Sequence, residues 1–217
     1  NARIEDLIKI PDAKLNVVHC QRSATYIADL IKQGFEVPYI GVSLFGIEQT
    51  SNALRKTARF FGLEEKAEQV IAEETARVEK ALAFYRERLQ GKKVAIYVGA
   101  PRVWHWIKVM EELGMSVVAC ACTFAHEDDY EKINARAKDG VLVIDNPNEF
   151  EIEEMLHTYK PDLFLTGLKE KYIGRKMGIP TVNSHSYEKG PYAGYAGFVN
   201  FARDIYQGIY APVWKLL

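Results

Sequence analysis

Two patterns of apolar and polar positions follow one another along the chain. From residue 92 onward, short apolar runs of strand length alternate with stretches whose apolar residues recur at helical spacing. This alternation is typical of right-handed βαβ crossovers and of a parallel sheet. The predicted strands cover residues 94–98, 116–122, 141–144, 163–165 and 180–183. The predicted helices cover residues 101–113, 127–138, 149–159, 169–177 and 197–209.

The first 90 residues are richer in helical patterns. Strands are predicted over 15–19 and 37–42, and helices over 24–33, 48–61 and 64–89. We therefore expect an α/β fold of Rossmann-like, three-layer α/β/α subdomains with parallel sheets. A partial subdomain with connecting helices would occupy residues 1–90. A second subdomain would occupy residues 91–217 and end in a loop and a C-terminal helix.

The stretch 15–23 joins a buried strand to a helix. Ser23 is predicted to cap this helix and Gly34 to end it. Cys20 and Arg22 would then lie at the carboxyl edge of the sheet, where α/β proteins bind ligands. The guanidinium and the helix N-terminus both favour the thiolate, the form of cysteine that binds metals. A small buried side chain at a strand end is the alternative role for Cys20.

Four further turns follow predicted strands and would reach the same edge. They carry Gly99 and Arg102, Phe124, Lys169 and His185. A lysine at a helix start opposes the helix dipole, and an anionic ligand would relieve that cost. One thiolate, one imidazole and several cations favour a bulky anionic cofactor held at two ends. A nucleophilic cysteine–histidine pair is the other chemistry that these residues allow.

Composition narrows the function classes. The 217 residues carry 28 basic and 29 acidic side chains in interspersed positions, for a net charge of −1. This balance favours neither nucleic acid nor an acidic membrane as partner. We expect no membrane span, because no apolar run reaches the required length. Three cysteines do not make a disulfide framework, so a cytoplasmic location is expected.

Several motifs, in order along the chain, resemble those of the nitrogenase component 1 alpha-chain family, in its C-terminal half. The resemblance covers nearly all of the sequence. The motifs are Leu15–Ser23, Phe124–Tyr130, Gly167–Tyr172, Lys176–Pro180, His185–Ser186, Gly190–Tyr192 and Phe201–Asp204.

This resemblance implies a cofactor, an iron–sulfur cluster that carries a heterometal and homocitrate. The family's cysteine ligand, which binds a terminal iron, falls on Cys20. The family's histidine ligand, which binds the heterometal end, falls on His185. The lysine near homocitrate falls on Lys169. Residues that hydrogen-bond or pack against the cluster fall on Arg22, Ser23, Gly99, Arg102 and Phe124.

The resemblance also implies partners, a homologous beta chain and an ATP-driven iron–sulfur reductase. The family's relay iron–sulfur cluster is bound by N-terminal cysteines that have no counterpart in this sequence. We therefore expect the relay cluster only in a longer, full-length chain, and we expect these 217 residues alone not to reduce dinitrogen.

Some motifs leave the heterometal open between molybdenum, vanadium and iron alone. Gln21 and the run 104–106 resemble the vanadium and iron-only chains, whereas 124–129 and 167–171 resemble the molybdenum type. Tyr187 stands where the molybdenum enzyme usually has tryptophan.

Three other roles remain open. The first is a non-catalytic cofactor-assembly scaffold, which the stretch 41–46 resembles, although such scaffolds typically lack the histidine found at His185. The second is a nitrogenase-like reductase of another substrate. The third is a metal-free α/β binding domain, in which Cys20 and His185 would lie far apart or face the core.

Overall fold

The computed structural model describes residues 3–185 and 189–215, so Tyr187 lies outside the described residues. The chain divides into two compact units. Unit 1 comprises the residues up to 44 together with 48–73, and unit 2 comprises 45–47 together with 74–217. Each unit is described by itself.

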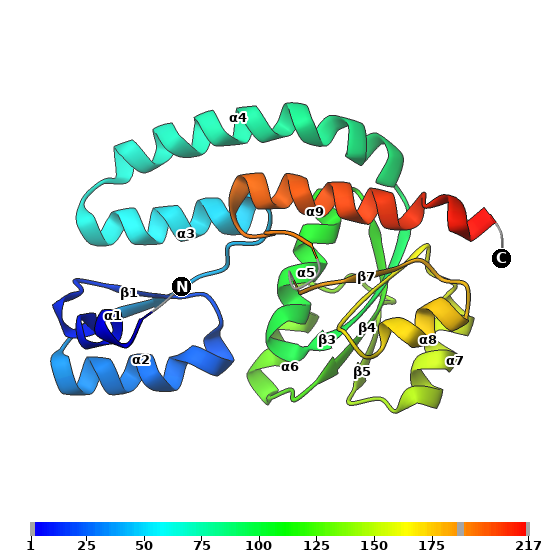
Figure 1. Ribbon diagram of the computed structural model, residues 1–217, viewed down its shortest axis with the longest axis horizontal. Helices are drawn as coiled ribbons and strands as arrows, with labels where there is room; N and C mark the ends of the chain where they lie inside the picture. Colours follow the sequence, from blue (N-terminus) through cyan, green and yellow to red (C-terminus); the bar gives the residue numbers. More distant parts are fainter. Residues whose placement is uncertain (1–2, 186–188, 216–217) are drawn as a thin grey trace. The chain divides into compact units, whose positions relative to one another are not determined.

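Unit 2 is built on a five-stranded parallel sheet with the strand order β5-β4-β3-β6-β7 (Figure 1). The strands are β3 (Lys93–Gly99), β4 (Ser116–Thr123), β5 (Leu142–Asp145), β6 (Leu163–Thr166) and β7 (Thr181–Asn183). The helices are α5 (Ala100–Glu112), α6 (Glu127–Asn134), α7 (Glu149–Tyr159), α8 (Lys171–Lys176) and α9 (Gly194–Ile209), followed by the short 3-10 helix η2 (Pro212–Lys215). The predicted fold class, a parallel-sheet α/β protein that ends in a helix, is confirmed.

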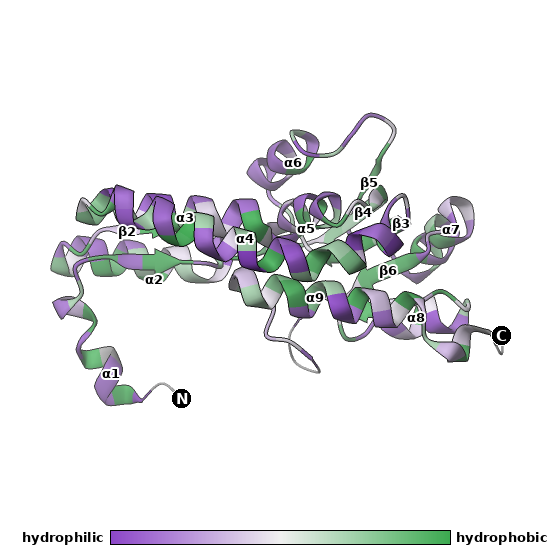
Figure 2. Ribbon diagram, turned by 90° about the horizontal axis from the view of Figure 1, so that it is seen from above, coloured by the Kyte–Doolittle hydropathy of each residue, from purple (hydrophilic) through white to green (hydrophobic). Residues whose placement is uncertain are grey.

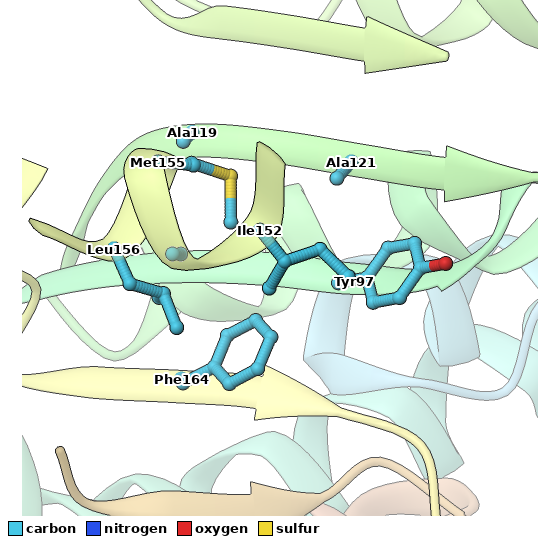
Figure 3. Close-up of a cluster of buried hydrophobic side chains, with 8 residues drawn as sticks. Tyr97, Ala119, Ala121, Ile152, Met155, Leu156 and Phe164 are labelled. Atoms are coloured by element: carbon cyan, nitrogen blue, oxygen red, sulfur yellow. The ribbon is translucent and has the colours of Figure 1, made fainter. Parts of the chain in front are cut away.

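Helices cover both faces of this sheet, with α7 and α8 on one side and α5 on the other (Figure 1). The central strand β3 is consequently apolar without alternation, and its residues 94–98 are all buried. On the α7 face, Ile152, Met155 and Leu156 pack against Tyr97 and Phe164 (Figure 3). This core fixes the carboxyl ends of β3 and β6 relative to α7.

Unit 1 contains a much smaller sheet, in which β1 (Asn16–Val18) pairs in parallel with β2 (Tyr39–Gly41). Before and between them lie α1 (Ile4–Ile8), the 3-10 helix η1 (Ile10–Asp12) and α2 (Gln21–Phe35). The helices α3 (Gly46–Phe61) and α4 (Glu64–Leu89) belong partly to each unit. The bounds of α4 are the predicted ones. Within the described part of the chain, no helix has the length and apolar character needed to cross a membrane.

Several predicted helix boundaries are wrong by two to four residues. The helix α6 ends at Asn134 and not at residue 138, and α9 begins at Gly194 and not near residue 197. Three further wrong boundaries concern α2 and α8. The helix α2 begins at Gln21 and not after Ser23, because the carbonyl of Cys20 already accepts the N–H of Ala24 (3.0 Å). Ser23 therefore lies inside the first turn. At the other end α2 continues through Gly34 to Phe35, and Glu36 closes the helix in the left-handed conformation (φ 58°).

The third wrong boundary concerns α8. This helix starts at Lys171 with Glu170 as its N-cap, so Lys169 lies in the preceding turn and not in the helix. The N–H of Ile173 reaches the carbonyl of Glu170 (3.0 Å) and sets this start. Lys169 is therefore not at the helix N-terminus, where the sequence predicts it to oppose the helix dipole.

Candidate functional site

The carboxyl edge of the unit 2 sheet carries most of the predicted site. The chain runs from β3 through β4 to β5 on one side and then returns to β6 and β7 on the other. The direction therefore switches between β3 and β6, which is where ligands bind in open α/β sheets. The structure brings five predicted residues to this edge, each just after a strand: Gly99, Arg102, Phe124, Lys169 and His185.

His185 follows β7 and is fixed by its own strand end. Its backbone N–H donates to Oδ1 of Asn183 (2.9 Å), and the Oγ of Ser184 lies 3.3 Å from its Nδ1. The N–H of Ser184 donates to the carbonyl of Thr166 in β6 (2.8 Å). The half-buried imidazole is thus attached to two adjacent strands.

Two effects lower the pKa of this imidazole below its ordinary value. Burial lowers the pKa of His185, and the nearby positive charge of Arg102 lowers that pKa further. A neutral imidazole is the form that binds metals. Burial and the charge of Arg102 from α5 therefore both act on His185 in the direction that favours this form.

The glycine-containing turn after β3 leads into α5. Gly99 is the N-cap residue, and Pro101 occupies the first turn, as predicted. Among the described residues, no atom lies within 4 Å of a Cβ built at Gly99. A ligand can therefore approach the backbone at the start of this helix closely.

Phe124 follows β4 in a conformation that is unusual for its residue type. Its φ is 56° and its side chain is 85% exposed. The left-handed region costs a residue with a Cβ about 1–2 kcal/mol, and such strain is concentrated at functional sites. The next element, α6, begins at Glu127 as predicted, with His126 as its N-cap.

Lys169 and His185 line different cavities. Lys169 lines one of about 580 Å³ together with Tyr97, Glu170 and Tyr172, on the side of α7 and α8. His185 lines one of about 500 Å³ with other residues, among them Asn183 and Asp204. Sequence reasoning did not single out Glu170 or Asn183, because neither residue type forms a recognisable motif at its position.

Cys20, Arg22 and Ser23 lie together in unit 1, at the start of α2. Cys20 is half-buried and is the N-cap residue of the helix, and Arg22 and Ser23 are exposed in the first turn. The Nδ1 of His19 lies 3.3 Å from the N–H of Leu44 and accepts its hydrogen bond, which anchors the turn.

The candidate protein ligands at the carboxyl edge of the unit 2 sheet fit a preassembled metal cluster better than a single metal ion held only by side chains. Among residues 3–185 and 189–215, no group of three or more histidine, cysteine, aspartate or glutamate side chains could hold a metal ion. A closed site made of protein ligands, such as a structural zinc site, needs about four of them. At the sheet edge of unit 2, one imidazole with the cations Arg102 and Lys169 instead suits a preassembled anionic cluster that brings most of its own ligands.

Comparisons with known proteins agree on one family. The family model for nitrogenase component 1 type oxidoreductases matches residues 1–210. The chain is 51% identical to the nitrogenase molybdenum-iron protein alpha chain of Methanothermococcus thermolithotrophicus, over 100% of this chain and 46% of that one. It is 43% identical to the nitrogenase iron-iron protein alpha chain of Rhodobacter capsulatus, over 100% of this chain and 41% of the relative.

A solved structure agrees with these relatives. Nitrogenase Cp1 at pH 6.5 superimposes with a TM-score of 0.85 at 29% identity, over 95% of this chain and 51% of that chain. The present chain thus spans about half the length of the proteins that it matches.

Proposed function

Because the chain belongs to the nitrogenase component 1 type oxidoreductase family, we propose that it is the cofactor-binding half of a nitrogenase-type alpha chain. In this proposal the full protein reduces dinitrogen on an iron–sulfur–heterometal cofactor with homocitrate, and Cys20 and His185 are its ligands. The observation that carries the proposal is that His185, Arg102 and Lys169 all follow strands at the edge where the direction of the unit 2 sheet switches.

Each residue has a physical role in this proposal. The thiolate of Cys20 binds one end of the cluster and the imidazole of His185 binds the other. Arg102 and Lys169 balance the negative charge of the cluster and of the organic acid. Because Gly99 has no side chain, the backbone there can come close to the cluster. The exposed ring of Phe124 covers apolar surface of the cluster.

Two more residues act near the thiolate. Arg22 and Ser23, in the first turn of α2, offer a guanidinium and a hydroxyl to the cluster sulfurs. The bound cofactor supplies the electron storage and the surface on which substrate is reduced, and the protein positions and tunes it.

The whole activity requires more than this chain. We propose that a homologous beta chain, an ATP-driven iron–sulfur reductase and a relay iron–sulfur cluster complete the enzyme, and that residues 1–217 alone are inactive. The proposal leaves the heterometal open, because four molybdenum-iron relatives are 46–51% identical, an iron-iron relative is 43% identical, and three other molybdenum-iron relatives are 39–40% identical.

Metal analysis of the full-length protein tests the ligand assignment. The protein is purified without oxygen from nitrogen-starved cells, as wild type and as Cys20→Ala, His185→Ala and His157→Ala variants. We expect iron and heterometal to fall together in the first two variants. His157, exposed on α7, is the matched control and should leave both metals unchanged. Unchanged iron in both ligand variants would show that the cluster lies elsewhere.

Substrate turnover separates the catalytic chain from the scaffold alternative. We expect the metal-loaded wild-type enzyme, supplied with its reductase and beta chain, to form ammonia from dinitrogen. A protein that carries iron, releases it to another chain and shows no turnover would instead be an assembly scaffold.

A further inference from the structure

Gly167, the first residue after β6, has no conformational reason to be a glycine. Glycines such as Gly46, Gly114 and Gly178 have positive φ angles, which a residue with a Cβ adopts only at a cost. Gly167 is not one of the positive-φ glycines of the described chain. The reason for glycine here must therefore be the space next to it.

That space lies between two functional groups. A Cβ built on Gly167 would lie 3.3 Å from Oε2 of Glu170 and 3.9 Å from Cε1 of His185. The first distance is tighter than ordinary van der Waals contact, so the carboxylate would have to move by a few tenths of an ångström. A larger side chain would contact the imidazole as well.

The backbones of both neighbours are held in place. The backbone of His185 is attached to Asn183, which is 8% exposed, and Ser184 before it is 1% exposed. Glu170 is the N-cap of α8, and its carbonyl accepts the N–H of Ile173. Only side-chain rotation can relieve crowding at Gly167, and that rotation would change the direction of the imidazole or of the carboxylate.

We propose that Gly167 is a positioning residue for the cofactor end at His185: its missing side chain keeps the imidazole of His185 and the carboxylate of Glu170 apart in their binding orientations. This inference rests on the proposed function, since His185 is the ligand there. It assigns to Glu170 the role of a neighbour that limits the movement of the ring. It also explains why glycine follows β6 at the switch point.

Cofactor binding to graded variants tests this role. Full-length, cofactor-deficient protein is titrated with cofactor extracted from the wild-type enzyme, and bound metal and the electron paramagnetic resonance spectrum are recorded. Loss of a side chain that orients a metal ligand typically lowers metal affinity about 10–100-fold. We expect a loss of this size for Gly167→Val, a smaller loss for Gly167→Ala, and an altered spectrum in both.

A second substitution distinguishes positioning from simple misfolding. If crowding of Glu170 turns the ring, Glu170→Ala should restore part of the binding to Gly167→Val, so that the two effects are not additive. The matched control is Gly34→Ala in α2, because no described atom lies within 4 Å of a Cβ there. It should bind cofactor as the wild type does, and thermal unfolding of all variants checks that they are folded.

Clear outcomes overturn the inference. Wild-type affinity and spectrum in Gly167→Val would contradict it, and so would a loss that Glu170→Ala does not relieve. If His185→Ala also keeps its metal, the proposed function itself fails. If His185→Ala loses metal and Gly167→Val does not, only the role of Gly167 is wrong.

Discussion

The two units bury their apolar residues to very different degrees. In unit 2 the side chains of Ile96 and Phe164 are 0% exposed, between helices on both faces of a five-stranded sheet. In unit 1 the stripe formed by Tyr26, Ile27 and Leu30 on α2 is 75%, 55% and 47% exposed, and hydrophobic segments of that helix are visible in Figure 2.

The difference shows which unit has its own core. Unit 1 has only a pair of three-residue strands, which needs helices packed on it for stability, whereas unit 2 has five strands between helices. We infer that the geometry at the sheet edge of unit 2, including His185, is determined by its own packing. The start of α2, which carries Cys20, depends on whatever covers the exposed stripe.

The largest expected effect comes from deleting a buried ring in unit 2. Phe164→Ala removes a fully buried side chain from the cluster beneath α7 and should destabilise the protein by about 3–5 kcal/mol. Leu30→Ala on the exposed stripe is the comparison variant and should cost much less. Denaturant unfolding measures both. Equal losses would show that the α2 stripe is as well packed as the core of unit 2.

The next largest difference between the two units should be in the rates of amide hydrogen exchange. We expect amides of β1 and α2 to exchange about 100-fold faster than those of β3, because segments with few buried apolar contacts open locally at a lower free energy. Mass spectrometry of peptic fragments resolves the two regions. Similar protection in both would mean that the two units open as one.

The smallest expected effect is on how the free energy of unfolding changes with pH. Burial alone would raise the pKa of Asp162, but the ammonium of Lys92 (2.8 Å) and the N–H of Lys93 (2.8 Å) lower it overall. Because the folded-state pKa is lowered, this stabilisation is present above the ordinary carboxyl pKa and is lost as the pH falls through the folded-state value. For a partly exposed pair it amounts to about 1 kcal/mol or less.

Asp162→Asn should therefore lower stability at neutral pH and reduce the loss of stability on acidification. The control in unit 1 is Glu68→Gln, which removes the exposed ion pair with Arg55. We expect this control to change stability less than Asp162→Asn. Unfolding curves recorded between about pH 3 and pH 7 check both. A larger effect for Glu68→Gln would reverse the ranking of the two units.

Sequence patterns predicted elements well where local signals agree. The bounds of α4 and α7 came out as predicted, because capping residues and apolar faces specify both ends. The starts of α2 and α8 did not. Ser23 satisfied a local capping rule, but the N–H of Ala24 bonds the carbonyl of Cys20, and at α8 the N–H of Ile173 bonds the carbonyl of Glu170. Boundaries of this kind depend on contacts that no short window contains.

The residues of the candidate site also fall into those that the sequence pointed to and those that it did not. Strand ends followed by glycine, cysteine, histidine or cations were visible in the sequence, because each predicted strand and the residues after it lie within one short stretch of the chain. Glu170 and Gly167 as neighbours of His185 were not, because their proximity arises from β6 and β7 lying side by side.

By itself, the sequence determined the α/β class, the order of most elements and the family motifs, since these follow from local periodicity and residue chemistry. Only the tertiary structure decided the strand order that puts the switch point between β3 and β6. The tertiary structure also decided that the charge of Arg102 lowers the pKa of His185 and that the apolar stripe on α2 is exposed. These features depend on packing between segments far apart in the chain, which local patterns do not encode.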